Sequence, residues 1–379
     1  MNEPVYLDHH SATPPLKEVL ETFVRTSKEY WGVISSFHFI GQQPMYPLQK
    51  AVNSLFDKLG AKAKDELFLL RGEEAVWRVF FHTYLQVSRE TGKTLFLTAQ
   101  EQEMSWIKLC AQMEELGCSH KALPLNAKGQ VTRQALEAAI TPRTALFSIS
   151  WADGLTGVIH PVEDLVAVCR EKNVLFHIDA SYVFGKRFFR FQDIGADFLT
   201  IDGASIQSLQ DTGLLFIKEG TPVRLERSAP SIAIASTLAL AVEERQSKFE
   251  HYCMETARLR DRLEEGVLEG FSEAVVLFKE ADRLPNVTVI AFQGVYSEAL
   301  LFLLNSKGIY ASFGGGKFQQ LEAVLVAAGV EVNLAKCALS FSLSWDTSEE
   351  EIEHSIELII ACAKQIKRCS KEIDPCKNI

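Results

Sequence analysis

The stretch DFLTIDGASIQSLQDTGLLFI, residues 197–217, holds two apolar runs joined by a polar turn. The runs at 198–201 and 213–217 are rich in Phe, Leu and Ile and show little polar alternation, which is typical of strands buried on both faces. The turn contains Gly203 and Ser205 but no lysine. The stretch therefore predicts a strand, a polar turn and a second buried strand.

Similar apolar runs recur upstream and alternate with helical patterns at 74–90, 103–116, 132–140 and 161–172. Strands that alternate with helices predict an α/β fold with a mainly parallel sheet covered on both faces. Ligands of such sheets bind at the carboxyl ends of the strands. The upstream strand runs are ELFLL (66–70), TLFLT (94–98), TALFSIS (144–150) and VLFHIDA (174–180).

The pattern changes after residue 230. Residues 231–268 predict one long helix that bridges two domains, because no Gly or Pro interrupts them before Gly266. Further strands at 286–292 and 338–343 lie among helical patterns, which indicates an α+β arrangement. The predicted organisation is a large domain at 14–245 and a small α+β domain made of 1–13 and 246–379.

The charge and composition of the chain exclude several classes of function. The net charge of −10 argues against nucleic-acid binding, which needs clustered Lys and Arg. No apolar run reaches the length of a membrane span, and the start MNEPVYLDHH lacks the layout of a secretion signal. The eight cysteines form no C-x-x-C pair, so no metal site is predicted. We expect a cytoplasmic protein that binds neither nucleic acid nor membrane.

Five motifs follow one another along nearly the whole chain. They are YLDHHSATP (6–14), WGVISSFHFIGQ (31–42), TPRTALFSISWADGLTGVIHP (141–161), HIDASYVFGK (177–186) and RLPN (283–286). In this order they resemble the motifs of the cysteine desulfurases, which are class V aminotransferases, a branch of the fold-type I enzymes that depend on pyridoxal 5′-phosphate (PLP). The resemblance implies a mostly parallel seven-stranded sheet, a smaller C-terminal domain and a homodimer.

The resemblance also assigns the cofactor-binding positions. Asp179 matches the carboxylate that pairs with the pyridine nitrogen of PLP. The family's S-G-H-K turn corresponds to residues 202–205, which places Ser205 at the Schiff-base lysine, Asp202 at the assisting serine and Ala204 at the histidine. A serine cannot form an imine. Glu74 stands at the phosphate-binding threonine, and carboxylates at 74 and 202 repel a phosphate dianion.

The remaining family positions are also changed. Gln102 corresponds to the histidine that stacks on the cofactor, Tyr182 to the glutamine that contacts its ring oxygen, and Asp153 to the asparagine pair. Lys317 corresponds to the catalytic cysteine and Ser340 to the arginine that binds the substrate carboxylate. No catalytic residue of the family is therefore expected to be retained.

The favoured interpretation is a family member that has lost PLP binding and desulfurase activity. It acts as a dimeric scaffold or regulatory partner, for an active desulfurase or an iron–sulfur assembly protein, and no cofactor is expected. The alternative is an enzyme of altered chemistry, with PLP or another ligand in the old pocket. Glu74, Asp153, Tyr182 and Lys317 then form a new polar cluster. The visible absorbance of lysine-bound PLP separates the two interpretations.

Overall fold

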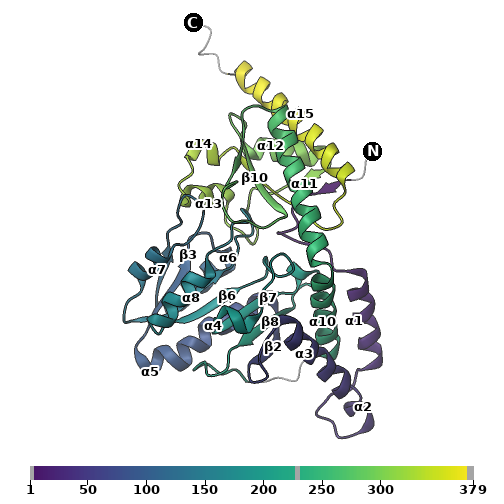
Figure 1. Ribbon diagram of the computed structural model, residues 1–379, viewed down its shortest axis with the longest axis vertical. Helices are drawn as coiled ribbons and strands as arrows, with labels where there is room; N and C mark the ends of the chain where they lie inside the picture. Colours follow the sequence, from purple (N-terminus) through teal and green to yellow (C-terminus); the bar gives the residue numbers. More distant parts are fainter. Residues whose placement is uncertain (1–3, 227–230, 374–379) are drawn as a thin grey trace.

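The computed structural model describes residues 4–226 and 231–373, and its larger layer is a seven-stranded sheet (Figure 1). Its strands are β2 (Glu66–Leu70), β3 (Leu95–Ala99), β4 (Ser119–Leu123), β5 (Thr144–Ser150), β6 (Leu175–Asp179), β7 (Phe198–Asp202) and β8 (Gly213–Ile217). The spatial order is β2-β8-β7-β6-β5-β3-β4. Strand β8 is antiparallel to both of its neighbours, whereas the pairs from β7 to β4 are parallel. The predicted mostly parallel sheet is confirmed.

Residues 197–217 form β7 and β8, and their side chains pack in two separate hydrophobic cores. Phe198 and Leu215 pack in the core on one face of the sheet, whereas Leu199 and Phe216 pack in the other core. All four are fully buried. Each such side chain contributes about 1.5–3 kcal/mol on burial. Both faces are covered, which explains why these strands lack polar alternation.

Strand β4 was not predicted. It lies at the edge of the sheet, paired with β3 alone, and its sequence SHKAL is exposed at alternate positions. An edge strand with one solvated face does not resemble the continuous apolar runs of the interior strands.

Helices cover the sheet and confirm the four predicted helical patterns. The first of them, 74–90, is interrupted by a π-helical turn at Tyr84–Ser88. The helices of this part are α1 (Lys17–Glu29), α2 (Phe39–Gln42), α3 (Met45–Leu59), α4 (Gly72–Thr83), α5 (Arg89–Thr91), α6 (Met104–Glu115), α7 (Arg133–Ala139), α8 (Val162–Glu171) and α9 (Phe191–Ile194), with a 3-10 turn at Ala204–Ile206.

The single helix predicted at 231–268 is instead two helices, α10 (Ile232–Ser247) and α11 (Phe249–Gly270). Lys248 leaves helical geometry between them, with ψ of 11°. Its amine lies 4.5 Å from the centre of the Trp345 ring and 2.8 Å from the Glu244 carboxylate. These side-chain contacts accompany the break, and neither Gly nor Pro marks it. α10 packs on α1 and α3, whereas α11 packs on α15 (Glu349–Ile373).

The C-terminal part contains a small antiparallel sheet of order β12-β10-β9 and a two-stranded parallel sheet of β1 and β11. The strands are β1 (Val5–Tyr6), β9 (Ala274–Leu277), β10 (Val287–Phe292), β11 (Ile309–Tyr310) and β12 (Ala338–Ser342). The helices are α12 (Ser297–Ser306), α13 (Leu321–Ala327), α14 (Val332–Ala335) and α15. The N-terminal strand thus joins the C-terminal part, as expected for 1–13, and the boundary at 245/246 stays a prediction. Across residues 4–226 and 231–373, no helix combines the length and apolar character that a bilayer span requires.

Candidate functional site

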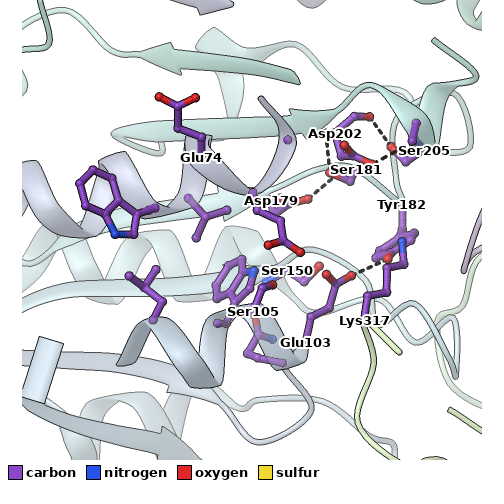
Figure 2. Close-up of a pocket in the computed structure, with 18 of the residues that line it drawn as sticks. Glu74, Glu103, Ser105, Ser150, Asp179, Ser181, Tyr182, Asp202, Ser205 and Lys317 are labelled. Carbon is purple, nitrogen blue, oxygen red and sulfur yellow. Dashed lines mark hydrogen bonds between the residues drawn. The ribbon is translucent and has the colours of Figure 1, made fainter. Parts of the chain in front are cut away.

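A pocket of about 750 Å³ opens at the carboxyl edge of the seven-stranded sheet. Ser150, Asp179 and Asp202, the last residues of β5, β6 and β7, line it. Gly72 at the start of α4 and Lys317 from the loop between β11 and α13 also line it. Figure 2 shows Lys317 beside Tyr182 and apart from Glu74. This is the edge at which ligands of parallel α/β sheets bind.

The pocket is acidic. A site that gathers charges of one sign attracts ligands of the opposite sign, here cations, and disfavours a dianion. Among the described lining residues are six carboxylates and two lysines, namely Glu73, Glu74, Glu103, Asp179, Asp202 and Asp211 against Lys108 and Lys317.

Asp179 is held by two hydrogen bonds. The backbone N–H of Ser181 donates to Oδ1 and the Thr200 hydroxyl donates to Oδ2, each at 2.8 Å. Burial raises the pKa of Asp179 from its usual value, and these bonds oppose that rise. The carboxylate is thus fixed in orientation at the end of β6.

Asp202 and Ser205 form a compact turn after β7 (Figure 2). The Ser205 hydroxyl donates to the Asp202 backbone oxygen at 2.7 Å, and the Asp202 N–H donates to Ser181 Oγ at 2.8 Å. The Asp202 carboxylate lies against the first residue of α4, because a Cβ added to Gly72 would be 2.4 Å from Asp202 Oδ1. A helix start favours negative charge. Burial nevertheless raises the pKa of Asp202.

Glu74 lines the pocket but has its own counter-ion. Arg78, one turn along α4, approaches its carboxylate to 2.6 Å. Figure 2 shows Glu74 apart from the group formed by Asp202 and Ser205. Its charge is therefore partly compensated, whereas Asp202 forms no ion pair within the part of the chain that the structure describes.

Tyr182, Glu103 and Lys317 form a second polar group on the wall opposite Glu74. The Tyr182 hydroxyl donates to Glu103 Oε1 at 2.5 Å, and the Lys317 amine lies 5.0 Å from the centre of the Tyr182 ring. Burial raises the pKa of Glu103 to about 7, although the charge of Lys317 lowers it. A carboxyl with such a pKa can exchange a proton near neutral pH.

The loop that carries Lys317 is anchored to the segment before α6. Residues 314–316 are glycines with φ between 65° and 88°, a region that other residues rarely adopt. The Met104 N–H donates to the Lys317 carbonyl at 2.8 Å, and the Gln319 side chain donates to the Gln102 carbonyl at 2.8 Å. These bonds hold the backbone of Lys317 at the pocket, and its amine lies over the Tyr182 ring.

Other predicted positions lie here as well. Gln102 is buried and accepts a hydrogen bond from the Ser150 N–H at 3.1 Å, and Ala204 lines the same pocket. Sequence reasoning missed several lining residues, among them Glu103 and Trp106. The first directly follows Gln102, and the second lies one turn further along α6.

Asp153 and Ser340 are not among the residues that line the pocket. Asp153 Oδ1 instead accepts hydrogen bonds from the N–H and hydroxyl of Thr156, at 2.6 and 2.7 Å, which secures a buried turn. Burial raises the pKa of Asp153 to about 6. The Ser340 hydroxyl donates to the Leu155 carbonyl at 2.6 Å. Of the polar cluster predicted around Lys317, Tyr182 lies beside the lysine, whereas Asp153 does not line the pocket and Glu74 pairs with Arg78 instead.

The chain is similar to proteins of a known family. A family model described as aminotransferase class-V matches residues 5–251. Cysteine desulfurase 2 of Trichormus variabilis and cysteine desulfurase NifS of Azotobacter vinelandii are each 30% identical to this chain, over 97% of it and 94% of their own length.

Solved structures agree on the fold. A NifS-like protein matches with a TM-score of 0.86 at 24% identity, over 96% of this chain and 100% of that one. A NifS-like protein from Rickettsia africae matches with a TM-score of 0.81 at 20% identity, over the same shares of the two chains. The chain belongs to the cysteine desulfurase-like family of class V aminotransferases.

Proposed function

We propose that this protein is a non-catalytic member of the family that acts by binding, as a dimeric scaffold or regulatory partner in sulfur or iron–sulfur metabolism. Its relatives carry the name cysteine desulfurase, and the cofactor of the family is PLP. The proposal therefore depends on whether the residues of the pocket fit PLP.

The observation that carries the proposal is the turn of Asp202 and Ser205. Ser205 stands at the position assigned to the lysine, and its hydroxyl cannot form an imine with an aldehyde. The Asp202 carboxylate lies against Gly72, at the helix start that would otherwise attract a phosphate. The Asp202 carboxylate thus lies where the phosphate of PLP would bind. These residues do not fit PLP, even though Asp179 suits a pyridine nitrogen.

The purified protein is expected to be colourless and to release no sulfide from cysteine. An active desulfurase purified in the same way is the positive control. Borohydride reduction followed by peptide mass spectrometry gives a second readout, because it reports PLP on any lysine, including Lys108 and Lys317 in the pocket. Reducible PLP on a lysine of the untreated protein contradicts the proposal and supports an enzyme of altered chemistry.

We also propose a homodimer, supported by an apolar surface on the segment between α1 and α3. Trp31 is 71% exposed, Phe37 is fully exposed and Phe39 is 75% exposed, with Met45 and Tyr46 beside them in sequence. The segment around α2 lies at the end of the molecule far from the C-terminal sheet (Figure 1). Exposed apolar clusters of this kind mark interaction surfaces.

The double change Phe37→Glu and Phe39→Glu is expected to weaken dimerisation at least about tenfold, because charged groups are costly to bury at an interface. Sedimentation at micromolar concentration measures the effect. Phe302→Glu on α12, where the side chain is 78% exposed, is the control. A wild-type protein that sediments as a monomer contradicts the proposed dimer.

The partner proposed is an active desulfurase or an iron–sulfur assembly protein. Affinity purification from the native host, with mass spectrometry, tests this part. Recovery of such a protein with the wild type, and its loss with the Phe37→Glu and Phe39→Glu variant, would also place the contact surface.

A further inference from the structure

A second and smaller cavity, here called the inner chamber, has a volume of about 10 Å³. His9, Lys186, Arg245 and Asn286 are among its lining residues. They come from the N-terminal segment, the region after β6, α10 and the start of β10, so the chamber joins four separate parts of the chain. Its volume admits one water-sized particle.

Lys186 brings an amine to the chamber. Its Nζ donates to the Tyr182 carbonyl at 3.1 Å and lies 3.2 Å from His10 Nε2. His10 Nδ1 lies 2.8 Å from the Gly154 carbonyl, so this nitrogen carries the hydrogen and Nε2 accepts from Lys186. An ammonium has three N–H groups. Two of those of Lys186 are thus accounted for, and the third is available to an occupant of the chamber.

Arg245 brings a second cation. Its guanidinium lies over the rings of Tyr252 and Trp345, 5.3 and 5.5 Å from their centres, and the residue is 6% exposed. Its Nε has no hydrogen-bond partner. Asp346 acts on Arg245 favourably through its charge, but in the part of the chain that the structure describes neither Arg245 nor Lys186 forms an ion pair. Burial lowers the pKa of both basic groups.

Two further buried atoms at the chamber lack partners, His9 Nδ1 and Asn286 Oδ1. An unpaired buried polar group costs about 1–3 kcal/mol, so three such atoms around one cavity indicate an occupant. Arg245 Nε donates, as does the third N–H of a charged Lys186. Burial lowers the pKa of His9 to about 4, so its ring is neutral at pH 7 and Nδ1 donates in the tautomer that carries its hydrogen there. Asn286 Oδ1 accepts, which favours water. Water is therefore the competing occupant.

We propose that the inner chamber binds one halide-sized monovalent anion, held by Arg245, Lys186 and His9. A buried arginine and a buried lysine that form no ion pair among the described residues are costly while both are charged. A bound anion offsets that cost and opposes the fall in the pKa of Lys186. The size of the chamber excludes phosphate and carboxylate ligands. The anion then links the N-terminal segment to α10 and to the region after β6, so chloride stabilises the folded chain. The site is independent of the proposed function.

Bromide identifies the occupant directly. Crystals of the wild-type protein grown with sodium bromide in place of chloride are expected to show an anomalous difference peak in the chamber, beside Arg245 Nε. A water-like peak without anomalous signal at molar bromide overturns the proposal, as do bromide peaks confined to the protein surface.

Stability gives the second measurement. At equal ionic strength, sodium chloride is expected to raise Tm by about 2–4 °C relative to sodium gluconate, since a ligand that binds only the folded state stabilises it. The variants Arg245→Gln and Lys186→Met should each lose this chloride-specific rise. Arg258→Gln, which removes a half-exposed arginine paired with Glu255, should keep it. If either chamber variant fails to fold, the other variant and the wild-type bromide experiment still decide. A rise of equal size in all four proteins contradicts an anion in the chamber.

Discussion

The combined variant Ser205→Lys, Asp202→Ser, Ala204→His and Glu74→Thr is expected to bind PLP covalently and to turn yellow. The new lysine supplies the imine, and the new serine and threonine remove two carboxylates from the pocket. The chain should then bind PLP about 10–100-fold more tightly than the Ser205→Lys variant, because unfavourable charge contacts of one to three kcal/mol are relieved. Titration with PLP, followed by visible absorbance, measures this gain.

The structure predicts which substitution recovers the most PLP affinity. Asp202 lies against the start of α4 and forms no ion pair with any residue that the structure describes, whereas Glu74 is paired with Arg78. Ser205→Lys with Asp202→Ser should therefore recover more affinity than Ser205→Lys with Glu74→Thr, and these two double variants are matched controls. Ser205→Lys alone should bind PLP weakly at best. No variant should release sulfide, because the sequence resemblance assigns Lys317 and Ser340 to the positions of the family's cysteine and arginine. Equal affinity in all the variants would show that Asp202 does not obstruct the phosphate.

The second large effect is a pH-dependent stability that Glu103 causes. Its pKa is about 7 in the folded chain, above the ordinary value of 4.5. The folded state therefore binds a proton that the unfolded state has released, so this stabilising contribution is complete below pH 4.5 and is lost as the pH rises to about 7. Glu103→Gln removes the titration and keeps an acceptor for the Tyr182 hydroxyl. Between pH 4 and 8 the variant should gain about 3 kcal/mol relative to the wild type.

Urea unfolding at several pH values between 4 and 8 measures this difference. Asp153, whose pKa is raised to about 6, contributes in the same direction in both proteins and cancels from the comparison. Glu90→Gln, an exposed change on α5, is the control and should follow the wild type. A Glu103→Gln difference that is constant over the whole pH range would show that the Glu103 carboxyl is not held in an unfavourable environment.

The central strands could be predicted because each is buried on both faces. Phe198 and Leu199 enter different cores, so their run shows little polar alternation. Strand β4 could not be recognised in this way, since one of its faces is solvated. The break at Lys248 is accompanied by contacts with Trp345 and Glu244, and the first of these lies almost a hundred residues away in the sequence. Local propensity does not report such tertiary contacts.

Only part of the candidate site could be predicted, because sequence motifs give the position of a residue but not the direction of its side chain. The positions at the ends of β6 and β7, such as Asp179 and Asp202, follow from motifs with fixed spacing beside recognisable strands. The direction in which a side chain points is set by its local turn. Asp153 turns back to Thr156 and does not reach the pocket, whereas the glycines before Lys317 allow that lysine to enter it. The pairing of Glu103 with Tyr182 joins residues far apart in sequence and has no sequence signal.

The pairing of β1 with β11 constrains the order in which a nascent chain can fold. Val5 pairs with Ile309, so β1 waits for a partner strand that is made about 300 residues later. The seven-stranded sheet has all of its strands once β8 has emerged, at residue 217. The C-terminal sheet is complete only after β12, and Asp8 then bridges to Ser342. Domains generally fold as units during synthesis. The larger sheet can therefore form before β1 has a strand to pair with, and β1 docks in a later step.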